Sequence, residues 1–261
     1  MTQLIVAGCS SGIGHSRHAS TAMVINDLVA LEAGSGLMNL DLETLLKIRS
    51  VVISHAHFDH VCGLPFLVEL IKQQSNGTLT VYGPSDAIEA LQQNVFNNRI
   101  WPDFTMLPSA HQASLKLVAL QPDQIHTIEG LSFLPVRVNH TVPAFGYFIQ
   151  GESGWLAYSG DTGPCPEFVH RLITWPRLHH ALVECSFPRS LASLATETGH
   201  LYTEDLIDLR VRLPMNTSLW VLSMKAWFLS DIQHELIGSN ESDNDSLSGL
   251  NLLEQWQILD F

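Results

Sequence analysis

The chain has 261 residues, of which 46% are hydrophobic and 15% charged, so it can bury a sizeable core in one large domain or two small ones. Its formal net charge is −13 with histidine neutral, and no cluster of lysine and arginine stands out. This balance argues against a surface that tracks DNA or RNA, whereas a small anionic substrate stays compatible, because bound metal ions can supply positive charge locally.

Predicted strands and helices alternate along the first half. Asn26 and Asp27 lie between two apolar runs and predict a two-residue hairpin turn. Apolar residues at helical spacing predict a helix over residues 64–71, and Pro84 is expected to open a second helix that reaches about Val95. Short apolar runs predict the strands, at residues 4–8, 22–25, 28–34, 51–54 and 79–83.

The second half repeats this alternation. Helices are predicted over residues 203–213, with Thr203 as the N-cap, and over 230–236. An acidic, Ser- and Asn-rich linker is expected at 239–249, and a terminal helix over 250–259. Strands are expected at residues 131–138, 146–150, 155–160, 180–186 and 218–224. The pattern predicts a layered α/β sandwich over residues 1–238, followed by a linker and short helix over 239–261.

The cysteines and the apolar runs bear on the cellular location of the protein. The four cysteines form no C-x-x-C pair, which argues against a zinc ribbon or a thioredoxin-like motif and favours a reduced, cytoplasmic location. The run VAGC at residues 6–9 is similar to a lipoprotein processing box, but the segment before it has no basic residue and is too short for a signal sequence. No apolar stretch is long enough to span a membrane.

The stretch SHAHFDH at residues 54–60 follows a predicted buried strand and carries four ligand-capable side chains. His55 and His57 project to the same side of an extended segment, and Asp59 and His60 follow where the chain turns toward a helix. Imidazole with carboxylate suits zinc, iron or manganese better than calcium or magnesium. The alternative is a solvated loop that happens to be rich in histidine.

Two further residues favour the metal site. His140 follows the predicted strand at 131–138, and Asp161 follows the strand at 155–160 in a turn flanked by glycines. Loops at strand ends on a rigid scaffold are where sites are commonly built. Either residue alone is typical of polar surface or a turn, but together with SHAHFDH they predict one metal centre.

These residues resemble the signature of the metallo-β-lactamase fold. The resemblance implies a four-layer αββα sandwich. It also implies one metal held by His55, His57 and His140, and a second held by Asp59 and His60, with Asp161 bridging both. Zinc is the expected ion, with manganese or iron as alternatives.

Further blocks are similar to those of the class II 3′,5′-cyclic-nucleotide phosphodiesterases. They follow one another in the same order as in that family and reach to about residue 237: GCSSGIG, EAGSG, NVFNNRIWPDF, SGDTGPCPEF, ECSFP and GHL. The resemblance implies hydrolysis of cAMP or cGMP to the 5′-monophosphate, with Glu184 and His200 as a proton relay and Asp59 as a further catalytic residue. Asn97, Arg99 and Trp101 are candidates for contact with the base and phosphate of the substrate. The alternative is that they form a packing corner.

Two positions depart from the family pattern. Glu32 stands where the family usually carries an aspartate that orients a ligand, and a longer carboxylate can still do so. Ser223 stands where the family has the last histidine of the second metal, and a hydroxyl is a much poorer ligand than imidazole. We therefore expect weaker binding of the second ion.

Three hypotheses stay open. The first is a cyclic-nucleotide phosphodiesterase acting on a small molecule, with no nucleic-acid or membrane partner and with a homodimer compatible with the family. The second is another hydrolase on this fold, such as an RNA-processing nuclease. The third is a weakly active relative that binds metal or nucleotide, which Ser223 keeps open.

Overall fold

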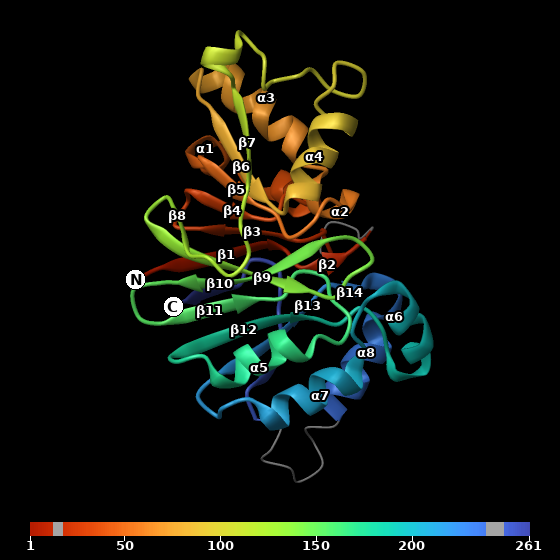
Figure 1. Cartoon of the computed structure of the whole chain (residues 1–261). Helices are drawn as coiled ribbons and strands as arrows, with labels where there is room; N and C mark the ends of the chain where they lie inside the picture. Colours follow the sequence, from red (N-terminus) through yellow and green to blue (C-terminus); the bar gives the residue numbers. More distant parts are fainter. Residues whose placement is uncertain (13–17, 239–247) are drawn as a thin grey trace.

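The computed structural model describes residues 1–12, 18–238 and 248–261. Two seven-stranded sheets face each other, and helices cover the outer face of each (Figure 1). The predicted four-layer αββα sandwich is thereby confirmed.

The first sheet contains strands from the N-terminal half and one from the C-terminus. Its order is β16-β1-β3-β4-β5-β6-β7, and α1, α3 and α4 lie on its outer side (Figure 1). The bounds of the strands are β1 (Gln3–Gly8), β3 (Ala22–Ile25), β4 (Val29–Leu31), β5 (Ser50–Val52), β6 (Leu79–Gly83), β7 (Leu115–Ala119) and β16 (Ile258–Asp260). The helices are α1 (Leu42–Lys47), α2 (Phe58–Val61), α3 (Leu64–Ser75) and α4 (Ser85–Asn94).

The second sheet has the order β15-β13-β12-β11-β10-β9-β8, and α5, α7 and α8 lie on its outer side (Figure 1). The bounds of its strands are β8 (His126–Ile128), β9 (Leu131–Val138), β10 (Ala144–Gln150), β11 (Trp155–Tyr158), β12 (Leu178–Glu184), β13 (Ser218–Leu222) and β15 (Leu250–Leu252). The helices are α5 (Pro166–Thr174), α6 (Ala192–Thr198), α7 (Thr203–Arg212) and α8 (Leu229–Gly238). A separate two-stranded sheet joins β2 (Ser10–Ser11) to β14 (Met224–Lys225).

Three apolar clusters fill the spaces between the layers. The central one joins the two sheets and includes Met23 and Leu31 from the first and Tyr147 and Tyr158 from the second. The outer clusters lie between each sheet and its helices. Burial of apolar surface on both sides of each sheet is the main force that holds the layers together.

The predicted hairpin is confirmed. Asn26 and Asp27 have φ values of 50° and 61°, the left-handed conformation that a two-residue turn of type I′ requires at both positions. The strands it joins, β3 and β4, pair antiparallel. The helices expected after residue 63 and after Pro84 are present as α3 and α4.

The C-terminal segment differs from the prediction. The helix expected over 250–259 is wrong, because β15 pairs parallel with β13 and β16 pairs antiparallel with β1. The edges of two sheets offer unpaired backbone groups, and pairing with them outweighs the weak helical pattern of a short apolar run. These strands complete the same two sheets as the preceding residues. Of the expected linker, residues 239–247 lie outside the described residues.

The start of α7 also differs. Tyr202, not Thr203, occupies the N-cap position, and its backbone N–H donates to the Asp205 carboxylate at 3.1 Å. Thr203 is buried, and its hydroxyl donates to Glu235 instead. A tertiary partner therefore takes the hydroxyl that local capping would have used.

No helix within the described ranges combines the length and the apolar composition that a membrane crossing requires.

Arg210 joins the end of α7 to the loop before β13. Its side chain is buried, and its guanidinium donates to the carbonyl oxygens of Thr217, Leu213 and Pro214 at 2.5, 3.0 and 3.0 Å. A planar group with several donors can satisfy three carbonyls at once.

We expect Arg210→Met to lower the free energy of unfolding by about 3 kcal/mol, because three carbonyl oxygens each lose a hydrogen bond from the buried guanidinium. The matched control is Arg212→Met, whose exposed guanidinium pairs with Asp208 one turn away and is expected to change stability by less than about 0.5 kcal/mol. Urea unfolding of both variants measures the difference, and equal losses would contradict the role given to Arg210.

Candidate metal centre

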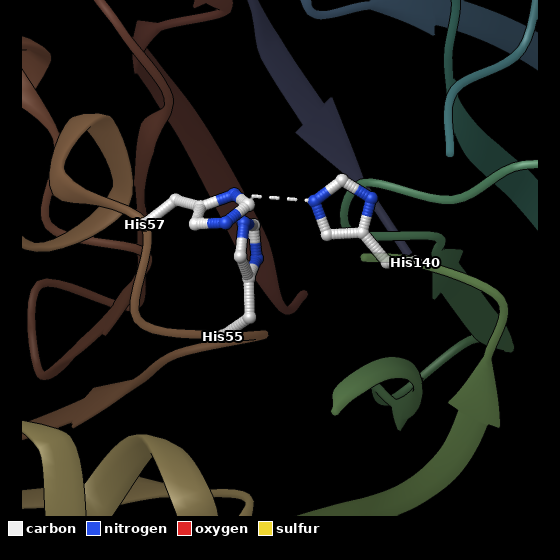
Figure 2. Close-up of side chains that lie close together, drawn as sticks. All are labelled: His55, His57 and His140. Carbon is white, nitrogen blue, oxygen red and sulfur yellow. Dashed lines mark hydrogen bonds between the residues drawn. The ribbon is translucent and has the colours of Figure 1, made fainter. Parts of the chain in front are cut away.

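Ligand-capable side chains gather where strands of the two sheets end. Figure 2 shows His55 and His57 on one part of the chain, facing His140 on another. The side chains that follow the strand ends are His55, His57, Asp59 and His60 after β5, His140 after β9, and Asp161 after β11. The structure therefore brings together residues that are more than a hundred positions apart.

Close backbone contact holds these strand ends in place. The Phe145 N–H donates to the Ser54 carbonyl at 3.0 Å. Gly160 has a φ of +60°, and a Cβ at this position would lie 2.7 Å from the Ser54 Cβ. A side chain at Gly160 would push apart the segments that carry His55 and Asp161.

The three predicted ligands of the first metal converge. Nitrogen atoms of His55, His57 and His140 lie within 4.8 Å of one another. The Nε2 atom of His140 lies 3.2 Å from Nδ1 of His57, and a dashed line joins these two side chains in Figure 2. The other nitrogen of His140 lies 2.8 Å from the Gly199 carbonyl oxygen. A backbone acceptor of this kind holds Nδ1 protonated and leaves Nε2 free for a metal.

A second group shares His55 with the first and adds His60 and Asp161. His60 Nε2 lies 3.3 Å from the Asp161 carboxylate, and His60 Nδ1 lies 3.5 Å from Glu32. Glu32 is fully buried and also accepts from the Ser54 N–H at 2.9 Å. As expected for this position, the longer carboxylate still reaches a ligand-capable histidine.

The residues present fit a divalent cation. In the described part of the chain, four buried polar atoms at the centre have no hydrogen-bond partner: His55 Nε2, Asp161 Oδ1, His60 Nδ1 and Glu32 Oε2. The last two lie 3.5 Å apart as an ion pair, so His55 Nε2 and Asp161 Oδ1 are the atoms left for a cation. Each unpaired buried polar atom costs about 1–3 kcal/mol, and a cation among these donors removes that cost. Nitrogen and carboxylate donors together suit zinc, iron or manganese.

The protonation of the histidines divides them into two kinds. Burial lowers the pKa of His55 well below its ordinary value, and it also lowers the pKa of His57 and His140. These three are neutral at pH 7 and can serve as ligands. Burial opposes the proton on His60 as well, but Asp161 and Glu32 outweigh it and raise that pKa well above its usual range. A metal at His60 must displace a proton.

Glu184 and His200 form the predicted pair. The Glu184 carboxylate lies 2.7 Å from His200 Nδ1 and accepts from the Thr162 N–H at 3.0 Å. Burial opposes protonation of His200, but Glu184 and Asp161 outweigh it and raise its pKa. A third ligand-capable group, His140, Asp161 and His200, places this pair beside the histidine cluster.

A cavity of about 530 Å³ opens onto these groups, and its lining includes His57, Asp161 and His200. Asp59 also lines it, but belongs to none of the three ligand-capable groups. The Asp59 carboxylate instead accepts from the Gly12 N–H at 2.9 Å. Its assignment as a metal ligand and catalytic residue therefore stays a prediction.

Ser223 is buried near the Glu184–His200 pair. Its backbone N–H donates to the Cys9 carbonyl at 2.7 Å, and its carbonyl accepts from the Ser186 hydroxyl at 3.2 Å. The same hydroxyl lies 3.3 Å from His200 Nδ1. The end of β13 thus reaches the centre without an imidazole or carboxylate.

The three residues considered as substrate contacts lie outside the cavity lining. The Asn97 side chain accepts from the N–H groups of Arg99 and Ile100 and so shapes a turn. The Trp101 ring packs edge-on against Phe66 with 5.4 Å between centroids. Asn97, Arg99 and Trp101 are absent from the lining of the cavity, which favours the packing-corner interpretation.

The sequence interpretation missed several cavity residues. Ser11, Gly12, Phe58, Cys62 and Lys225 all line it. Ser11 and Lys225 are far apart in the chain, and only the pairing of β2 with β14 brings them together. Phe58 had a local signal, because an apolar residue stands inside the polar stretch HAHFDH.

Residues 29–219 match the family model described as the β-lactamase superfamily domain. The chain belongs to the β-lactamase superfamily. A Yersinia pestis protein named as a probable 3′,5′-cyclic-nucleotide phosphodiesterase is 30% identical over 162 residues, which make up 56% of this chain and 46% of that protein. The chain therefore spans about half the length of this relative.

Two other comparisons widen the range of related hydrolases. A ribonuclease Z from Ignicoccus hospitalis is 25% identical over 222 residues, which cover 67% of this chain and 70% of that protein. The crystal structure of unliganded yeast PDE1 superposes with a TM-score of 0.80 at 19% identity, covering 100% of this chain and 99% of that one. At this identity, the superposition bears on the fold alone.

We expect Ser223→His to increase the amount of zinc bound per chain, because an imidazole would add a ligand at the end of β13. Ser223→Ala is the matched control and should leave zinc content unchanged. Metal analysis after exhaustive dialysis measures both, and circular dichroism checks that the buried substitution has not unfolded the protein. Unchanged zinc content in a folded Ser223→His variant would contradict the expectation.

Proposed function

We propose that the protein is a metal-dependent phosphodiesterase that hydrolyses a 3′,5′-cyclic nucleotide to the 5′-monophosphate. One observation carries the proposal: the buried Glu184–His200 pair lies within ligand range of His140 and Asp161. A proton donor thus stands next to a cluster suited to a divalent cation. The name of the Yersinia relative supports a cyclic nucleotide as the substrate. So does the name of a Saccharomyces cerevisiae protein, 3′,5′-cyclic-nucleotide phosphodiesterase 1, which is 34% identical over 103 residues.

The metal ligands we propose are those of the first two converging groups, which are His55, His57, His60, His140 and Asp161, and His200 of the third group is kept as the proton donor. Bound divalent ions would supply positive charge to a phosphate and make a water more acidic. Zinc is the proposed ion, because neutral imidazoles dominate the donor set.

In the proposed reaction, side chains of the protein donate and accept the protons. Water attacks phosphorus, the bond from phosphorus to the ribose 3′ oxygen breaks, and that oxygen takes a proton from His200. Glu184 holds the imidazole by its Nδ1–H and stabilises the protonated ring. We assign to Asp59, which lines the same cavity, the role of accepting the proton that the water loses.

Charge and cysteine chemistry support the remaining parts of the proposal. A net charge of −13 disfavours a long polyanion such as RNA and leaves a small substrate as the better fit. All four cysteines are free thiols, in keeping with a reduced, cytoplasmic setting. A homodimer stays a prediction.

A second candidate function is RNA processing, since the sequence match to the ribonuclease Z from Ignicoccus covers 67% of this chain and the match to the Yersinia phosphodiesterase covers 56%. The same metal groups and proton donor serve either phosphodiester. The two candidates differ in the size and charge of the substrate.

We expect the zinc-loaded protein to convert cAMP or cGMP to the 5′-monophosphate, and His200→Ala to lower kcat by about 10²–10⁴-fold with its zinc content unchanged. His111→Ala is the matched control, because His111 is exposed and lies outside the cavity lining. Chromatographic product analysis and metal analysis give the two readouts. Hydrolysis of neither nucleotide with zinc, manganese or iron would contradict the proposal, and cleavage of a precursor tRNA instead would favour the nuclease.

A further inference from the structure

Lys225 provides a positive charge inside the cavity. It lies opposite Ser11 in the pairing of β14 with β2. Its ammonium lies 3.3 Å from the Ser11 hydroxyl and 5.2 Å from the centre of the Phe187 ring. Backbone pairing, a hydrogen bond and a cation–π contact therefore hold the charge in one place.

The surroundings of this ammonium favour an anionic ligand. None of the ion pairs found among the described residues includes Lys225. The chain has 13 lysines and arginines against 26 acidic residues, and the cavity itself contains Asp59 and Asp161. A lysine left without a carboxylate in so acidic a protein has its donors available for a phosphate.

Two exposed aromatic rings lie near the opening of the same cavity. Phe58 lines it and is 75% exposed. Trp227, two residues after Lys225, is 61% exposed, and its ring lies 3.7 Å from where a Cβ on Gly12 would be. Gly12 also lines the cavity, so the Trp227 ring lies next to one of the lining residues. Exposed aromatic rings stack well against nucleobases.

We propose that the cavity binds a nucleotide in one orientation, with the phosphate against Lys225 and the base against Phe58 and Trp227. The anion site follows from the position of Lys225 alone. The assignment of the base rests on the proposed function, since it takes the substrate to be a nucleotide.

Calorimetric titrations of the zinc-loaded protein with inorganic phosphate and with 5′-AMP test the orientation. Lys225→Met should raise the dissociation constants of both ligands by about ten-fold, whereas Lys225→Arg should preserve them within about three-fold. The double variant Phe58→Ala with Trp227→Ala should raise only the dissociation constant of 5′-AMP, by about ten-fold. Lys116→Met, on the exposed side of β7, is the matched control and should change neither.

Two results would overturn the proposal. Unchanged phosphate affinity in a folded Lys225→Met variant removes the anion site. If the ratio of 5′-AMP to phosphate affinity is unchanged in the aromatic double variant, the base does not lie against Phe58 and Trp227, and the proposed orientation is wrong. Both ligands bind without turnover, so failure of the protein to hydrolyse cyclic nucleotides would contradict the proposed function and leave this test intact.

Discussion

The contact between the end of β5 and the second sheet is the constraint on which the candidate site depends. The Tyr147 hydroxyl donates to the Ile53 carbonyl at 2.7 Å, and the Phe145 N–H donates to the next residue, Ser54, at 3.0 Å. Both bonds cross from one half of the chain to the other directly before His55. They fix the start of the histidine stretch against β10, the strand that lies between β9 and β11, after which His140 and Asp161 follow.

The acidity of the protein makes positive charge in the cavity necessary for any phosphate substrate. Asp59 and Asp161 line the cavity, and the chain as a whole has a net charge of −13. Divalent ions at the histidine groups would reverse the local charge at one wall, and Lys225 adds a second positive charge. The net negative charge of the rest of the protein would repel a long polyanion.

Much of the fold and the site could be predicted from local patterns. The Asn26–Asp27 hairpin and the strand before His55 each carry a short-range signal. The terminal strands β15 and β16 could not be predicted in the same way, because their partners β13 and β1 lie far away in the sequence. Lys225 was missed as a cavity residue for the same reason: its place depends on the pairing of β14 with β2.

The central claim is that His55, His57, His60, His140 and Asp161 form a divalent metal centre. Anomalous diffraction at the zinc absorption edge from crystals grown with zinc tests it directly. We predict the strongest peak among His55, His57 and His140, and a weaker one beside His60 and Asp161. The absence of a peak at the three histidines, with zinc found only at exposed surface residues, would contradict the account.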